Sequence, residues 1–295
     1  MKRANLTKVG IIESLRNLGI KEKDFLFVTA DIMKVGYFNI SREQTLLDWI
    51  DIFRTVVGEE GGIVMASYTH GFLRFKKKDI VFSRFIETYT GSLPNELIRQ
   101  PDSLRSTHPT HSVIAIGKNL KPLIENHTET SLSYSILGDM INYQNSKFLM
   151  LGTMDKVNAP QATHYVQEEL GYTKWSPYKF LYQIYYMKDG IKKLYTKNDY
   201  GGCSGGSYKL YGPLIVGNAI EIGKVGRAPS GLMSAQKSYQ VIKSVLSENK
   251  RAVLCDDKCC TQCYGNVFYN GWGVFPFVIR KTWSVIQSRI KSKSQ

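Results

Sequence analysis

The chain has 295 residues and a formal net charge of +14, from 39 Lys and Arg against 25 Asp and Glu. Its ordinary balance of 43% hydrophobic and 22% charged residues excludes a disordered chain, and the length predicts one large domain or two modest ones. No run approaches the roughly 18 apolar residues of a membrane span, and the N-terminus lacks the apolar stretch of a signal peptide. We therefore expect a cytoplasmic protein whose charge favours a polyanionic partner, such as nucleic acid, a membrane surface or a phosphate-bearing ligand.

The predicted elements alternate between helix and strand. A helix with apolar residues at helical spacing is expected over 6–18, closed by Gly19 as a C-cap glycine. Short apolar runs predict buried strands at 25–28, 63–65, 113–116 and 147–151. Further helices are expected at 41–57, opened by Ser41 with Gln44 three residues on, and at 232–246. Another, in which His164 lies early, is expected to run to Leu170. This alternation predicts an α/β fold with a central, mostly parallel sheet flanked by helices.

Two segments depart from that alternation. Residues 181–195 predict an added β-hairpin, because strand-forming residues flank Lys188-Asp189-Gly190. The glycine-rich run 201–206 predicts a mobile loop.

Histidines are the first candidates for acid–base chemistry, because an unperturbed histidine titrates near neutral pH. The chain has five: His70, His108, His111, His127 and His164. None lies in an H-E-x-x-H or H-x-H metal-binding pattern. Each is either a hydrogen-bonded structural residue, which is the simpler interpretation, or a general base.

The segment 105–112 is dense in hydrogen-bond donors just before a predicted strand. It is either a polar turn or an anion site, in which Arg105 and neighbouring hydroxyls hold phosphate oxygens. The sequence has no G-x-x-x-x-G-K-[ST] loop and no strand-linked G-x-G-x-x-G, which disfavours nucleotide hydrolysis and dinucleotide redox chemistry. Scattered basic residues and the lack of a recognition module also disfavour nucleic-acid binding.

More specific patterns occur in five separated segments. They are 26–36, 61–69, 90–99 with 105–109 and Ser112, 163–168, and 223–228. Together, and in this order, they resemble the aminoglycoside 3-N-acetyltransferase family. The resemblance implies an acyl-CoA-dependent N-acyltransferase with an antibiotic N-acetyltransferase-like fold. In agreement, the R/Q-x-x-G-x-G/A pyrophosphate loop of the commoner acetyltransferase fold is absent.

The resemblance implies direct transfer, in which an amine attacks the thioester carbonyl and His164 takes the proton. The family's acid stands three residues after the histidine, where this chain has Gln167; Glu168, one position later on the same helix face, is the expected substitute. The family's threonine three residues before the histidine is replaced by Gln161, so Thr163 is the candidate donor to the thioester oxygen.

The resemblance also implies ligand-binding residues. Acetyl-CoA or another acyl-CoA is expected to bind at Thr29, Ala30, Asp31, Lys34, Val35, Gly36, Arg105, Ser106 and Ser112. The acceptor is expected at Tyr68, His108 and Glu169.

The net charge bears on which amine is acylated. A positive protein repels polycationic aminoglycosides but attracts anionic nucleotide-linked amino sugars. We therefore expect an N-acyltransferase for a nucleotide-linked amino sugar in surface polysaccharide biosynthesis. The alternatives are an aminoglycoside 3-N-acetyltransferase conferring antibiotic resistance, and a non-catalytic binding protein of the same fold.

The segment after residue 250 differs in composition. We expect an acyltransferase domain at 1–250 and a basic, cysteine-containing tail at 251–295. The tail carries Cys255, Cys259, Cys260 and Cys263 as C-x3-C-C-x2-C. This pattern is part of a zinc or iron–sulfur signature, but no second pair stands at the usual spacing. We expect free thiols in a reducing compartment, and no required metal.

The last part of the tail predicts an amphipathic helix. Ile279, Trp283, Ile286 and Ile290 form one stripe among basic residues in 279–293. Such a helix either lies on an anionic membrane surface or packs on the domain or on a partner subunit of a homodimer, and the packing interpretation is preferred.

Overall fold

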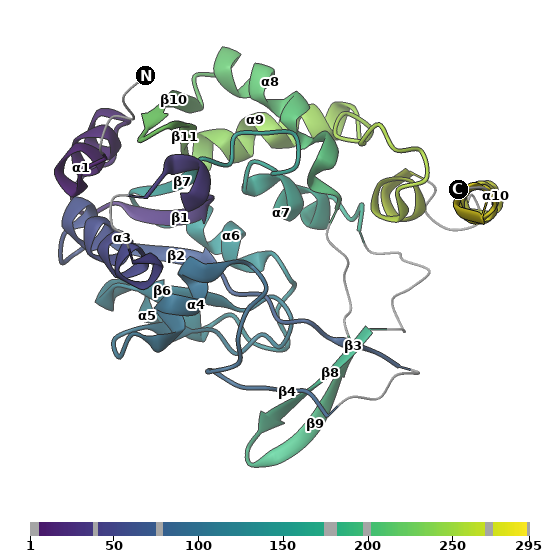
Figure 1. The fold of residues 1–295 in the computed structure, drawn as a ribbon, viewed down its shortest axis with the longest axis horizontal. Coiled ribbons are helices and arrows are strands. Elements are labelled where there is room, and N and C mark those ends of the chain that lie inside the picture. The colour runs from purple at the N-terminus through teal and green to yellow at the C-terminus, as the bar shows by residue number, and fades with distance from the viewer. Residues whose placement is uncertain are drawn as a thin grey trace.

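A seven-stranded sheet forms the centre of the molecule, in the order β10-β11-β7-β1-β2-β6-β5 (Figure 1). The structure, a computed structural model, describes residues 6–37, 41–74, 79–173, 182–196, 202–268 and 274–293. The strands are β1 (Phe25–Ala30), β2 (Gly62–Ala66), β5 (Leu104–Arg105), β6 (Val113–Ile116), β7 (Ser146–Leu151), β10 (Ile220–Val225) and β11 (Ala228–Ser234).

Strand direction changes from the centre of the sheet to its edges. β1 pairs in parallel with both β2 and β7, whereas the pairings of β6, β5, β11 and β10 with their neighbours are antiparallel. The predicted α/β class with a parallel centre is confirmed. The sequence did not reveal the direction of β6, because all four of its residues are buried, as in a central parallel strand.

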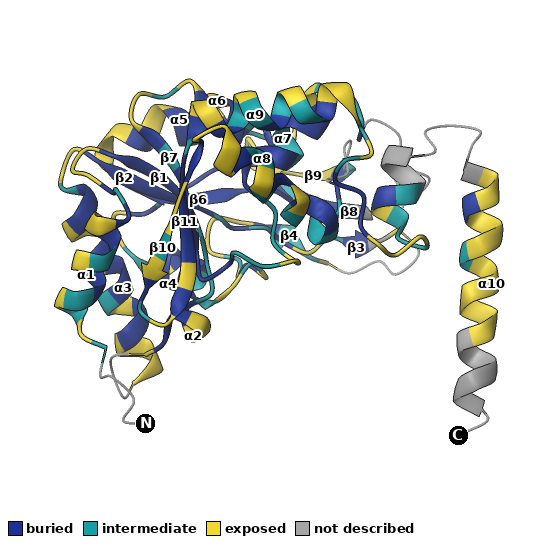
Figure 2. Cartoon of the chain, turned by 90° about the horizontal axis from the view of Figure 1, so that it is seen from above, coloured by how far each residue is buried: buried dark blue, intermediate teal, exposed yellow. Residues whose placement is uncertain are grey.

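Helices cover both faces of the sheet. One core contains Leu26 and Val28 of β1 with the apolar faces of α1 (Lys8–Asn17), α3 (Arg42–Val57) and α4 (Ser92–Arg99). The other contains Phe25 and Phe27 of the same strand, since successive side chains point to opposite faces. Its helices are α5 (Lys121–Glu125), α6 (Ser135–Ile141), α7 (Ala162–Glu169), α8 (Tyr211–Val216) and α9 (Ala235–Glu248). Figure 2 shows the buried strands between helices whose outer faces are exposed.

Side-chain caps set where the helices begin. The Ser41 hydroxyl accepts the backbone N–H of Gln44, as predicted for the start of α3, and Gly19 closes α1 with a φ of 107°. The helix predicted at 232–246 instead begins at Ala235, where the Ser234 hydroxyl accepts the N–H of Lys237. The residues before Ser234 belong to β11, so the apolar periodicity carried the prediction too far toward the N-terminus.

A smaller sheet lies beside the main body and contains the predicted hairpin (Figure 1). Its strands are β3 (Phe72–Leu73), β4 (Val81–Phe82), β8 (Tyr182–Lys188) and β9 (Ile191–Thr196). The turn residues Asp189 and Gly190 both have positive φ, 54° and 75°, as a two-residue type I′ turn requires. The hairpin prediction is therefore confirmed.

The helix predicted in the tail exists as α10 (Val274–Lys293) and stands apart from the sheet (Figure 2). Phe277 is fully buried, whereas Ile279 and Trp283 are 71% and 61% exposed. Among the helices within the described ranges, none combines the length and apolar character needed to cross a bilayer. Both interpretations of this helix, membrane surface and subunit contact, stay predictions.

Candidate functional site

His164 lies in α7, next to the carboxyl ends of β1 and β7. Gln161, at the start of α7 and three residues before His164, donates from Nε2 to Thr29 Oγ1 at 3.2 Å and to the carbonyl oxygen of Leu149 at 3.0 Å. These bonds attach the start of α7 to the two central strands. The carboxyl ends of parallel strands are where α/β sheets bind ligands, so the imidazole is placed for chemistry.

Both ring nitrogens of His164 have polar neighbours. Nδ1 lies 3.0 Å from Gln167 Oε1, and Nε2 lies 3.1 Å from Ser204 Oγ. Because an amide oxygen only accepts hydrogen bonds, Nδ1 carries the proton and Nε2 presents its lone pair. The contact at Nδ1 comes from Gln167 and not from the expected Glu168, whose carboxylate accepts the backbone N–H of Tyr134 at 3.3 Å.

Glu168 nevertheless lies in the same buried environment. It is 6% exposed, and Tyr134, whose backbone N–H its carboxylate accepts, has its ring 5.2 Å from the His164 ring, centroid to centroid. Tyr134 also contacts His111, whose ring is 4.6 Å from that of Tyr68. Burial, with smaller contributions from the charges of Tyr89 and Glu168, raises the pKa of Tyr68 well above the usual tyrosine range. Tyr68 therefore stays neutral.

Arg105 has a structural environment that differs from the expected anion site. Its five N–H groups donate to Ser112 Oγ, Thr69 Oγ1 and the carbonyl oxygens of Ser67, Arg84 and Ile86. Burial lowers the pKa of Arg105 to about 10, since desolvation disfavours the charged form. A guanidinium has five N–H donors, so none is left for a phosphate, and the predicted CoA contact is not supported.

The neighbours of Arg105 are also used within the protein. Ser106 Oγ accepts the N–H of Val113 at 2.9 Å, and Ser112 Oγ donates to the carbonyl oxygen of Ser67 at 2.6 Å. His108 is fully buried, and its Nδ1 accepts the N–H groups of the next turn at 3.0 and 3.3 Å. Contacts of Ser106 and Ser112 with CoA, and of His108 with the acceptor, are therefore not supported.

Two further expected site residues of α7, Thr163 and Glu169, have surroundings that do not support their expected roles. Thr163 is fully buried, and its hydroxyl has no hydrogen-bond partner among the described residues, so it does not reach a surface that a thioester could occupy. Glu169 accepts hydrogen bonds from Tyr239 and Lys243 of α9, at 2.9 Å in each case. It joins the two helices, and a role in acceptor binding is not supported.

The predicted CoA loop after β1 is shaped by two local contacts. Asp31 caps the short helix α2 (Ile32–Val35) by accepting the N–H of Lys34, and the Lys34 ammonium contacts Asp155 at 2.7 Å. Val35 is fully buried, and Gly36 has a φ of 106° that disfavours other residues. Lys34 is exposed at the same end of β1 that Thr29 and Ala30 occupy. The CoA role of this loop stays a prediction.

Ser204 is a site residue that sequence reasoning missed. The 3-10 helix η3 (Ser204–Leu210) begins there, so the mobile loop expected at 201–206 is wrong for 204–206; Gly201 lies outside the described residues. Gly202 packs so closely against the Gln167 side chain that a Cβ on it would come 2.1 Å from Gln167 Oε1. The glycines in the sequence before Ser204 were the available signal of this close packing, because only glycine permits such an approach.

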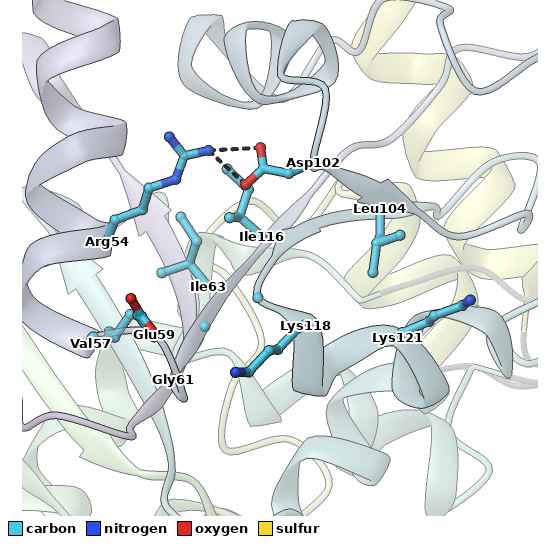
Figure 3. Close-up of a pocket in the computed structure, with 13 residues that line it drawn as sticks. Arg54, Val57, Glu59, Gly61, Ile63, Asp102, Leu104, Ile116, Lys118 and Lys121 are labelled. Atoms are coloured by element: carbon cyan, nitrogen blue, oxygen red, sulfur yellow. Dashed lines mark hydrogen bonds and ion pairs between the residues drawn. The ribbon is translucent and has the colours of Figure 1, made fainter.

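A pocket of about 570 Å³ lies elsewhere, at the amino end of β2 (Figure 3). Arg54 and Asp102 form an ion pair at 2.7 Å on its wall, and Lys118 and Lys121 also line it. Its lining residues include no histidine or cysteine. Because it lies at the opposite end of the strand from the Tyr68 side, it is separate from the candidate site.

Comparison with known proteins identifies the family. The family model described as aminoglycoside 3-N-acetyltransferase matches residues 27–247. A search among curated protein sequences gave no significant match.

The solved structures share the fold. The apoenzyme of aminoglycoside acetyltransferase AAC(3)-IVa has a TM-score of 0.70 and 18% identity, covering 90% of this chain and 98% of its own. A mutant of the same enzyme in complex with a gentamicin has a TM-score of 0.69, 20% identity and the same coverage. The YokD protein from Bacillus subtilis has a TM-score of 0.67 and 20% identity, with 83% and 94% covered. AAC-IIIb with CoASH has a TM-score of 0.61 and 18% identity, with 82% and 97% covered.

The family match spans most of the chain, and the chain belongs to the aminoglycoside 3-N-acetyltransferase family.

Proposed function

We propose that the chain is an acetyl-CoA-dependent N-acetyltransferase that uses His164 as general base and acts on an aminoglycoside-type amino sugar. The observation that carries this is the imidazole of His164, whose Nδ1 contacts Gln167 Oε1 and whose Nε2 contacts Ser204 Oγ, in a member of this family. In the reaction, the acceptor nitrogen bonds to the thioester carbonyl carbon, its proton passes to Nε2, and the carbon–sulfur bond breaks to release CoA. Ser204 occupies Nε2 in the structure, so the acceptor displaces its hydroxyl.

The cofactor proposal rests on the loop after β1. A neighbour of the same fold is described as a binary complex with CoASH. In this chain, exposed Lys34 lies in the loop that follows β1, whose Thr29 bonds to Gln161 at the start of the His164 helix. The Lys34 ammonium is a suitable partner for a phosphate. Asp155 and Asp31 keep the pKa of Lys34 raised, so the charge is present at neutral pH.

The proposed acceptor class follows from the local charge. Glu168 is a buried carboxylate close to the rings that surround His164, and such a group favours an ammonium-bearing acceptor. A neighbouring enzyme is described in complex with a gentamicin. A nucleotide-linked amino sugar remains the competing acceptor, favoured by the net charge of +14 alone.

An acceptor panel tests the proposal. Purified protein with acetyl-CoA should release thiol at least about tenfold faster with gentamicin or sisomicin than with nucleotide-linked amino sugars, a difference of about 1.4 kcal/mol in transition-state binding. Heat-inactivated protein gives the background rate. Faster release with the nucleotide sugars would overturn the acceptor class, and no release with either would overturn the transferase proposal.

Replacing Gln167 with Glu should increase the rate. A carboxylate stabilises the imidazolium that forms when His164 accepts the proton, and the neutral amide does so less. We expect Gln167→Glu to raise the plateau of kcat/KM about fivefold and to move its acid limb up by about one pH unit, because the base becomes harder to deprotonate. Gln167→Leu, which removes the acceptor, should lower kcat. Identical pH profiles for wild type and Gln167→Glu would contradict the contact.

A further inference from the structure

Four cysteines from two distant parts of the chain converge beside the candidate site. Cys203 precedes η3, whereas Cys255, Cys260 and Cys263 follow α9, and their four sulfur atoms all lie within 4.8 Å of one another. They are four of the five cysteines of the chain, and none is in a disulfide. Sequence reasoning considered only the four tail cysteines, which have no second C-x2-C pair at the usual spacing, and the structure groups only three of them, so a fourth ligand must come from elsewhere. The fold supplies that ligand as Cys203.

The spacing of the sulfur atoms matches the coordination shell of one ion. Four thiolates at about 2.3 Å from a tetrahedral zinc ion lie about 3.8 Å from one another. The four sulfur atoms, all within 4.8 Å of one another, are close enough to share one such ion, and none of them is in a disulfide. The run Cys255-x4-Cys260-x2-Cys263 also resembles the spacing of [2Fe–2S] ferredoxins. Such a cluster distributes its ligands over two irons, which requires a wider spread of sulfurs, so the geometry favours a single ion.

The surroundings stabilise negative sulfur. The N–H of Gly205 donates to Cys203 Sγ, and the N–H of Cys255 donates to Cys263 Sγ, both at 3.3 Å. Backbone donors of this kind orient thiolate ligands and offset their charge. Leu254, Tyr172 and Tyr264 pack around the cluster, so it lies in a largely apolar shell.

Cations border the cysteine segment. Lys209 donates to the carbonyl oxygen of Leu254 at 2.6 Å, and Lys281 of α10 donates to that of Cys259 at 3.0 Å. Four thiolates around a divalent ion carry a net charge of −2, which these ammonium groups partly offset. Cys259 itself is not a member of the group of four, although it is adjacent to Cys260.

We propose that Cys203, Cys255, Cys260 and Cys263 bind one zinc ion. Binding releases the thiol protons to solvent and leaves four thiolates on the ion. The ion would join the chain before η3 to the segment after α9. Ser204 follows Cys203 directly and contacts His164 Nε2. The ion would therefore also hold Ser204 against His164, and Gly202 against Gln167. This positioning role rests on the proposed function, whereas the metal site itself does not.

Metal analysis of the full chain tests the site. Protein produced without a polyhistidine tag and purified under reducing conditions should contain one zinc ion per chain by elemental analysis. Each of Cys203→Ser, Cys255→Ser, Cys260→Ser and Cys263→Ser should bind zinc at least about tenfold more weakly. The matched control is Cys259→Ser, which changes the neighbouring cysteine and should retain the full zinc content.

Wild-type protein gives a test that does not depend on variants folding. After zinc removal with a chelator, added Co²⁺ should bind one ion per chain and give the visible absorption of a tetrahedral tetrathiolate site. Iron with acid-labile sulfide, or no stoichiometric binding of zinc or cobalt, would overturn the proposal. Equal zinc loss in Cys259→Ser would overturn the choice of ligands. These readouts are independent of acetyl transfer, so they distinguish failure of the metal site from failure of the proposed function.

Discussion

Replacing His164 with Ala is expected to lower kcat/KM for acetyl transfer by a factor of about 10³, since a positioned general base contributes roughly 10² to 10⁴. The loss should appear mainly in kcat, because the imidazole acts on the proton that moves during bond formation. Steady-state thiol release with gentamicin as acceptor measures it. The half-buried position of His164 at the end of the sheet, and its contacts to the side chains of Gln167 and Ser204, predict little change in Tm.

A matched control comes from the pocket of Figure 3. Lys118→Ala changes a residue at the opposite end of β2 and should leave kcat/KM within about twofold, as surface changes generally do. If His164→Ala retained the wild-type rate, the mechanism would be wrong, and a non-catalytic protein of this fold would become the better description.

Arg105→Ala should cause the largest loss of stability. It removes a buried guanidinium that donates to acceptors from three chain segments, and it leaves the carbonyl oxygens of Arg84 and Ile86 without that donor. Leaving buried acceptors unpaired at several positions costs about 3–5 kcal/mol in total. At about 2–4 °C per kcal/mol for a domain near this size, Tm should fall by about 10 °C. Thermal unfolding followed by circular dichroism measures this change.

The conservative variant separates the structural role from anion binding. Lys keeps the positive charge but cannot reproduce five directed N–H donors, so Arg105→Lys should also destabilise, by somewhat less than Arg105→Ala. Its KM for acetyl-CoA should remain near the wild-type value. An unchanged Tm together with a KM raised tenfold or more would restore the anion-site interpretation of the sequence.

Elements with strong local signals were predictable from the sequence. Ser41 and Gly19 mark helix ends through their own hydrogen bonding and backbone conformation, and Lys188-Asp189-Gly190 encodes a two-residue turn. The direction of β6 was not predictable, because a strand buried on both faces shows the same apolar run in either direction. The start of α9 after Ser234 was also hard to predict. The apolar strand β11 continues directly into this amphipathic helix, so the apolar pattern does not show where the strand ends and the helix begins.

The site was predictable only where one residue type carries the chemistry. His164 could be singled out through the resemblance, but its partner could not. Gln167 and Glu168 stand three and four residues after it, so helix spacing allows either to reach the ring. Arg105 showed the opposite problem, since a guanidinium that binds carbonyl oxygens and one that binds phosphate look alike in a sequence. Ser204 and Cys203 belong to contacts across long chain separations, which no local pattern records.

The order of the strands has a consequence for synthesis on the ribosome. β7 pairs with β1 on one side, and the described strand that covers its other edge is β11, whose residues Gly231 to Ser234 come late in the chain. A nascent chain that has completed β7 but not β11 therefore exposes an apolar strand edge, which can pair with other chains. The β10-β11 hairpin, closed by a tight turn at Gly226 with a φ of 56°, ends this exposure once it emerges. Chains truncated between β7 and β11 are accordingly expected to aggregate.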